Sequence, residues 1–130
     1  MGKDSLKIMY EDEHLIVVEK PSGMLSVKTS GGVRRTRGNT VREEVTAHSL
    51  LNDYIRRSHR GRDARVYIVH RLDRDTSGLM VFAKSEEIKH LLQENWENAV
   101  TRRGYVAVSN WDSRNAPEGS IKSWLKENRA

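Results

Sequence analysis

The chain has 130 residues, of which 36% are hydrophobic and 32% are charged, so it offers enough sequence for one domain with a modest core. No apolar run approaches the roughly 20 residues that a bilayer-spanning helix needs, and no secretory signal is visible, so we expect no membrane partner. The absence of cysteine excludes disulfides and thiolate metal sites, and it suits a cytoplasmic location. A formal net charge of +5 favours a polyanionic partner.

The first two apolar runs, residues 6–10 and 14–19, flank a short acidic turn and predict an antiparallel β-hairpin. The segment Lys20-Pro21-Ser22-Gly23 ends the second strand, because proline removes a ladder donor and glycine permits a turn. Lys20 is either a solvated lysine of this turn or part of a functional site.

Residues 28–47 are polar with little periodicity, and we expect them to form a flexible basic insertion. The stretch from Lys28 to Arg37 has no acidic residue and includes Arg34 and Arg35. These arginines either contact the phosphates of a polyanionic partner or are simply solvated.

A helix is predicted after this insertion, with Ser49 as its N-cap and its end near Ser58. Its apolar stripe at helical spacing consists of Leu50, Leu51, Tyr54 and Ile55. A second basic cluster follows, made of Arg56, Arg57, Arg60, Arg62 and Arg65. This cluster either lies at the rim of a cleft that it shares with the polar segment of residues 70–78 or is a solvated face.

The centre of the chain is a polar segment, residues 70–78, between two apolar runs at 66–69 and 79–83. Both runs are rich in β-branched and aromatic residues, which favours buried strands. A polar loop held between rigid strands is a common way to present a reactive group. Asp73 is the candidate group, and the alternative is a surface loop with local ion pairs.

Beyond the second central strand, Ser85 is expected to cap another helix. The inward stripe of that helix is predicted to contain Ile88, Leu91, Leu92 and Trp96. Residues 104–109 alternate between two faces and predict a strand, and residues 120–130 again place apolar residues at helical spacing.

Three ordered blocks of the sequence resemble one family. They are His-Arg-Leu-Asp at residues 70–73 with Thr-Ser-Gly at 76–78, the block at residues 8–23, and Arg-Arg-Gly-Tyr-Val-Ala-Val at residues 102–108. Together they resemble the RluA-type pseudouridine synthases, which isomerise uridine in ribosomal and transfer RNA. The resemblance implies an α+β fold with a mixed, mostly antiparallel sheet and two or three packed helices, in a single partial catalytic domain over residues 1–130.

The resemblance also implies roles for the site residues. Asp73 is expected to be the nucleophile, kept ionised by the flanking Arg71 and Arg74, and Tyr105 to stack on uracil and act as acid or base. Expected RNA-binding or supporting residues are Lys20, Arg34, Arg35, Arg37, His70, Arg71, Arg74 and Thr76. His70 is expected to fix the loop by packing, and Thr76 by hydroxyl-to-backbone bonds. We expect RNA as the partner, and neither a cofactor nor a metal.

The chain departs from the family by lacking a later basic block, so we expect a C-terminally truncated catalytic domain. An incomplete sheet has an exposed edge, which invites self-association. Gly104, inserted between Arg103 and Tyr105, is expected to shift the setting of the tyrosine. Two other hypotheses stay open: a non-catalytic RNA-binding module or inactive fragment of such an enzyme, and a nuclease in which Asp73 and Asp75 bind magnesium.

Overall fold

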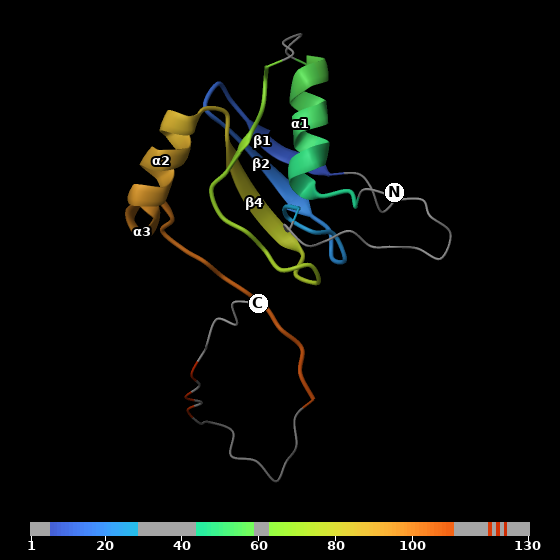
Figure 1. Ribbon diagram of the computed structural model, residues 1–130. Helices are drawn as coiled ribbons and strands as arrows, with labels where there is room; N and C mark the ends of the chain where they lie inside the picture. Colours follow the sequence, from blue (N-terminus) through green and yellow to red (C-terminus); the bar gives the residue numbers. More distant parts are fainter. Residues whose placement is uncertain are drawn as a thin grey trace, which may run out of the picture.

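The computed structural model describes residues 6–28, 44–58 and 63–110, together with residues 120, 122 and 124. These residues form an α+β fold in which a four-stranded antiparallel sheet has the strand order β1-β2-β4-β3 (Figure 1). The elements in chain order are β1 (Lys7–Glu11), β2 (Leu15–Lys20), α1 (Ala47–Ser58), β3 (Tyr67–Ile68), β4 (Gly78–Ala83), α2 (Glu86–Glu94) and α3 (Trp96–Ala99). The expected fold class is therefore confirmed. None of the described helices is both long enough and apolar enough to cross a membrane.

The predicted hairpin of β1 and β2 is confirmed, and its turn is encoded locally. The Asp12 carboxylate accepts hydrogen bonds from the backbone N–H groups of His14 and Leu15, both at 2.8 Å. These hydrogen bonds lower the pKa of Asp12, and the bond from Leu15 has the larger effect. β2 continues from this turn into the centre of the sheet, where it pairs with β4 from Leu15 to Lys20.

The core lies between the sheet and α1. Alternate residues of β2 and β4 point to one face, so that Val18 and Phe82 are fully buried there. On α1, Leu51 and Ile55 are one helical turn apart and pack into the same cluster. This packing anchors α1 against β2 and β4, and β4 directly follows the central loop.

The N-terminus of α1 differs from the sequence prediction. Helix α1 begins at Ala47, and its N-cap is Thr46 instead of Ser49. The Thr46 hydroxyl accepts from the Ser49 N–H at 3.1 Å, while the Ser49 hydroxyl accepts from the Thr46 N–H at 2.9 Å. The two side chains thus form a reciprocal capping box. The last residues of the 28–47 stretch therefore belong to the start of the helix, and its end near Ser58 is as predicted.

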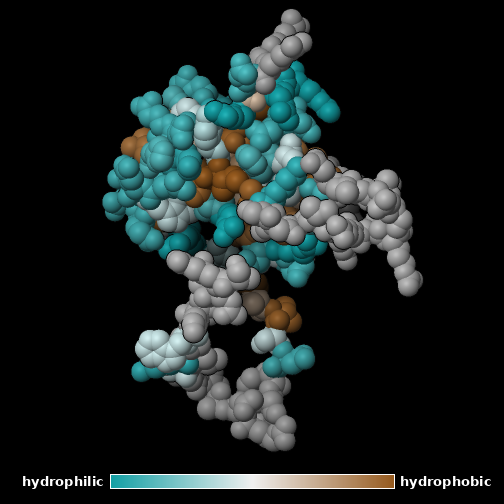
Figure 2. Space-filling view, viewed as in Figure 1, coloured by the Kyte–Doolittle hydropathy of each residue, from teal (hydrophilic) through white to brown (hydrophobic). Residues whose placement is uncertain are grey.

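Helix α2 is capped by Ser85 as predicted, because the Ser85 hydroxyl accepts from the Ile88 N–H at 3.2 Å. The predicted inward stripe is wrong at Leu91, which is 55% exposed, and α2 has no buried residue. The helix ends at Glu94, and Trp96 begins α3. Figure 2 shows a mostly hydrophilic face with a small hydrophobic area between α1 and α2. The burial values show that the described residues cover the apolar stripe of α2 only in part.

The strand predicted over residues 104–109 is not formed: residues 101–110 carry no strand. Val106 and Val108 are each 99% exposed, and Tyr105 is 70% exposed. A strand requires a neighbour to pair its backbone groups, and this segment has none among the described residues. Of the helix predicted over residues 120–130, most lies outside the described residues.

Candidate active site

Asp73 lies on the loop between β3 and β4, with an exposed side chain. The Thr76 N–H donates to the Asp73 carbonyl at 3.2 Å, which closes a turn directly after the candidate group. The loop ends at Gly78, whose φ of 143° is a backbone conformation that favours glycine. The loop geometry is thus defined by its own residues on the β4 side.

A second loop, directly after β2, holds the Asp73 loop from the other side. Lys20 pairs with Gly78 across the sheet, so the end of β2 lies beside the start of β4 and the two loops emerge together. The Gly23 N–H donates to the Arg74 carbonyl at 2.9 Å, and the Ser22 hydroxyl donates to the Asp75 carbonyl at 2.8 Å. These bonds join segments that are about fifty residues apart in the sequence.

Lys20 is fully buried, so of its two interpretations the solvated turn lysine is wrong. Its ammonium donates to the carbonyls of Pro21 at 3.0 Å, Met24 at 2.7 Å and Arg74 at 3.0 Å. Burial lowers the pKa of Lys20, and the negative charges of Asp75 and Asp73 partly oppose this shift. Lys20 therefore places a charged group beneath the loop and ties it to the end of β2.

Ser26 binds both backbone polar groups of Leu72, the residue that precedes Asp73. Its hydroxyl donates to the Leu72 carbonyl at 2.5 Å and accepts from the Leu72 N–H at 3.1 Å. Ser26 is 4% exposed and Leu72 is 8% exposed. Sequence analysis missed this residue, and the only signal for it was a lone serine between two apolar residues, Leu25 and Val27.

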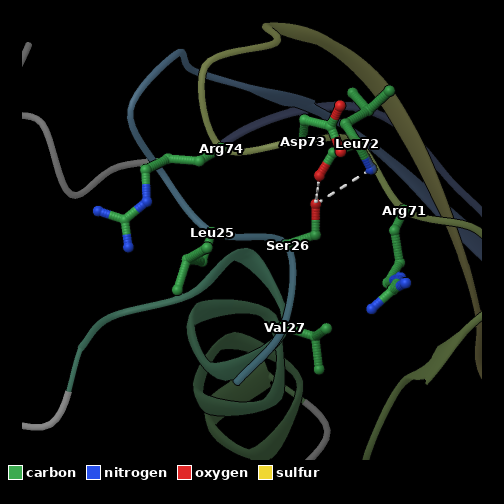
Figure 3. A pocket seen from close by; sticks show the side chains of 7 residues that line it. All are labelled: Leu25, Ser26, Val27, Arg71, Leu72, Asp73 and Arg74. Carbon is green, nitrogen blue, oxygen red and sulfur yellow. Dashed lines mark hydrogen bonds between the residues drawn. The ribbon is translucent and has the colours of Figure 1, made fainter. Parts of the chain in front are cut away.

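The two loops border an open cavity of about 390 Å³ that Asp73 helps to line. This volume falls within the range of roughly 300–1,000 Å³ that is typical of small-molecule sites. Figure 3 shows the lining residues, which are Leu25, Ser26, Val27, Arg71, Leu72, Asp73 and Arg74. The cavity can therefore accept a group of nucleoside size beside a solvent-accessible carboxylate.

The two arginines beside Asp73 do not both turn towards it. In Figure 3 their side chains extend in different directions from the loop. The Arg74 guanidinium binds the Glu44 carboxylate at 2.6 Å. Arg71 is exposed, lines the cavity and has no ion-pair partner among the described residues. Neither arginine forms an ion pair with Asp73 in this part of the chain.

His70 supports the loop from its β3 side. Its Nε2 accepts from the Val81 N–H at 3.1 Å, and its ring lies 4.9 Å from that of Trp96. Burial lowers the pKa of His70, which favours the neutral imidazole that this acceptor role requires. The expected hydroxyl bond of Thr76 is not found among the described residues, and its backbone N–H braces the loop instead.

The remaining predicted site residues are not brought to the cavity by the described chain. Tyr105 is largely exposed and does not line it. Arg34, Arg35 and Arg37 lie outside the described residues. Within the described ranges, no three His, Asp or Glu side chains come together to hold a metal ion, so Asp73 and Asp75 lack a further ligand there.

In this α+β fold, the loop before β4 carries the sequence His-Arg-Leu-Asp at residues 70–73 and exposes its aspartate. This combination of fold and loop defines a known class of proteins. The chain belongs to the RNA pseudouridylate synthase family, whose model matches residues 14–130. The expected likeness to RluA-type synthases is confirmed by its relatives.

The chain is 34% identical over 106 residues to tRNA pseudouridine synthase C of Pasteurella multocida (80% of this chain, 37% of the relative). It is 33% identical over 116 residues to the dual-specificity RNA pseudouridine synthase RluA of Vibrio cholerae (89% and 40%). A solved structure, human RNA Pseudouridylate Synthase Domain Containing 4, shares the fold with a TM-score of 0.52 at 24% identity (71% and 30%). The chain thus spans 37% and 40% of the length of these two curated relatives.

Proposed function

We propose that the protein containing this chain is an RNA pseudouridine synthase with Asp73 as its nucleophile. The observation that carries the proposal is the placement of Asp73. Its exposed carboxylate lines a cavity of about 390 Å³. Five hydrogen bonds between its loop and the residues Lys20, Ser22, Gly23 and Ser26 hold that loop to the neighbouring segment. A reactive group fixed at the wall of a cavity is the requirement for nucleophilic catalysis.

The proposed reaction is an isomerisation, so it needs no co-reactant. The bond between the ribose C1′ and the uracil N1 breaks, the base turns, and C1′ is joined to C5 of the same base. The proton that leaves C5 is balanced by a proton gained at N1. Asp73 assists as a nucleophile by attack on the anomeric carbon or on the uracil ring, which divides one difficult step into two.

Tyr105 is proposed as the residue that stacks on the base and accepts the C5 proton. Its phenol suits that role chemically, but its segment must first approach the cavity. The alternation of residues 104–109 supports such a movement, since Val106 and Val108 gain burial if the segment pairs as a strand.

The proposed partner is ribosomal or transfer RNA, and the proposed location is the cytoplasm. The target uridine must leave its stack to reach Asp73, at a cost of a few kcal/mol. Arg71 is proposed to offset part of this cost, because its guanidinium is exposed, lines the cavity and has no ion-pair partner among the described residues. Phosphate contacts from the arginines at positions 34, 35 and 37 are proposed to offset a further part of this cost.

A non-catalytic RNA-binding module is the second candidate. The observation that favours it is the exposure of Tyr105 outside the cavity, which leaves Asp73 without its expected acid–base partner. In this case the basic surface is kept and turnover is lost.

The test uses the full-length protein and a uridine-containing RNA, with pseudouridine measured by chromatography after digestion. The wild type should form product and Asp73→Asn should form none. Asp75→Asn is the matched control, because Asp75 is an exposed carboxylate of the same loop that does not line the cavity, and it should retain most of the activity. Salt-sensitive RNA binding without product supports the binding module. If Asp73→Asn forms as much pseudouridine as Asp75→Asn and the wild type, Asp73 is refuted as the nucleophile.

We also propose that the 130-residue chain self-associates with a second copy of itself. β1, which is five residues long, lies at an edge of the sheet, and Val106 and Val108 are each 99% exposed. Pairing of these groups between two copies buries apolar surface and satisfies backbone groups at the edge.

A further inference from the structure

We propose that Ser26 is a positioning residue for Asp73, because its hydroxyl fixes both backbone polar groups of Leu72 and so sets where the Asp73 carboxylate enters the cavity. The inference rests on the proposed function, since it deepens the account of the same site. The Ser26 hydroxyl is engaged with the backbone of Leu72, so its proposed role is to position Asp73 and not to react.

The geometry is a two-point clamp. One oxygen of Ser26 donates to the Leu72 carbonyl at 2.5 Å and accepts from the Leu72 N–H at 3.1 Å (Figure 3). The Leu72 side chain is packed in the core cluster and its Cδ1 lies close to Gly78, 3.7 Å from where a Cβ would stand. Both backbone groups and the side chain of Leu72 are therefore held, and the direction of the next residue, Asp73, is determined.

A serine side chain is needed here because the backbone carbonyl of Ser26 is already engaged. The carbonyl of Ser26 accepts from the His48 N–H at 3.1 Å, and the carbonyl of Leu25 accepts from the Ala47 N–H at 2.8 Å. A hydroxyl can donate and accept at the same time, which an alanine or a valine cannot do. The connection therefore runs from the core-anchored helix α1 through Ser26 and Leu72 to Asp73.

Loss of the hydroxyl leaves the Leu72 N–H and carbonyl without their partners in a buried environment. The loop must then turn these groups towards water, and Asp73 moves with them. A displacement of about 1 Å at a reacting group can lower the rate about 100-fold. A purely structural serine would instead lower stability without a specific loss of turnover.

The experiment compares Ser26→Ala, Ser26→Thr and Ser85→Ala in the full-length protein. Ser85 is the matched control because its hydroxyl also accepts a backbone N–H, but it caps α2 and does not line the cavity. We measure kcat and KM for pseudouridine formation, the midpoint of thermal unfolding, and amide hydrogen exchange of the peptide covering residues 71–76.

Ser26→Ala is expected to lower kcat about 10- to 100-fold with an RNA KM within about twofold of the wild type, and to speed exchange in this peptide. Ser26→Thr keeps the hydroxyl and is expected to recover most of kcat, whereas Ser85→Ala lowers the unfolding midpoint with unchanged kcat. The proposal is overturned if folded Ser26→Ala keeps wild-type kcat, or if Ser85→Ala loses turnover to the same extent. If Ser26→Ala does not fold, Ser26→Thr and Ser26→Cys decide the question, and a cysteine variant as active as the threonine variant overturns it.

Absence of product with the wild-type protein refutes the proposed function as a separate result. Hydrogen exchange then still decides whether Ser26 holds the loop, since faster exchange confined to residues 71–76 in Ser26→Ala supports the clamp. Unchanged exchange in that peptide contradicts it.

Discussion

Replacement of Lys20 by methionine tests whether a buried cation holds the two loops together. Lys20 is fully buried, and its ammonium donates to three carbonyl groups, those of Pro21, Met24 and Arg74. Methionine fills a similar volume but donates no hydrogen bond. We expect Lys20→Met to destabilise the fold and loosen the loop that bears Asp73.

The magnitude depends on which of the three carbonyl groups keep another donor among the described residues. The Arg74 carbonyl keeps the Gly23 N–H at 2.9 Å, so the Pro21 and Met24 carbonyls are the two that become unsatisfied. At about 1–3 kcal/mol for each unsatisfied buried group, the loss is at most about 2–6 kcal/mol, because the Pro21 carbonyl is only partly buried. Removal of a desolvated charge offsets part of this, which leaves a net decrease of about 2–4 kcal/mol in the free energy of unfolding.

The assay is urea unfolding followed by circular dichroism, with Lys7→Met as the control. Lys7 lies on β1 and its ammonium is 3.8 Å from the Glu19 carboxylate, with both side chains more than half exposed. An exposed pair of this kind contributes about 0–1 kcal/mol, so Lys7→Met should change stability little. A Lys20→Met variant within about 0.5 kcal/mol of the wild type would refute the reasoning, because surface substitutions alone have effects of that size.

Three further outcomes are expected. The pKa of His70 is lowered, so below the ordinary value of 6.5 the folded chain binds fewer protons than the unfolded chain. The stability contributed by neutral His70 is complete above pH 6.5 and is lost as the pH falls through the folded-state pKa. Unfolding measured from pH 8 to pH 4 should show this loss, and His70→Gln should reduce it. Thr46→Ala removes the N-cap of α1 and should lower the free energy of unfolding by about 1 kcal/mol, and an unchanged urea midpoint would contradict the capping role. Val106→Lys combined with Val108→Lys should abolish self-association of the 130-residue chain in sedimentation velocity, and a wild-type chain that sediments as a monomer at every concentration would contradict that proposal.

The parts of the fold that were predicted correctly are encoded by neighbouring residues. Asp12 binds the backbone two and three residues ahead, and Ser85 binds the backbone three residues ahead, so each signal is visible in a short window. The central loop between β3 and β4 was found in the same way, from two apolar runs around a polar segment.

The errors come from contacts that no short window contains. Ser26 and Leu72 are 46 residues apart, and the burial of Lys20 depends on Arg74, which is 54 residues away. Periodicity identified Leu91 as apolar but could not show whether anything covers it. The alternation at residues 104–109 likewise indicates which side chains would share a face of a strand. It does not indicate whether a neighbouring strand is present to pair with the segment.

The first turn of α1 has a consequence for how the protein can recognise an anion. Its four leading amides are all engaged: Ala47 and His48 donate to the loop after β2, while Ser49 and Leu50 donate to Thr46. A helix with its amides committed in this way cannot offer them to a phosphate. Under the proposed function, recognition of the RNA backbone near the cavity therefore falls to cationic side chains, and affinity there should decline steadily as ionic strength increases.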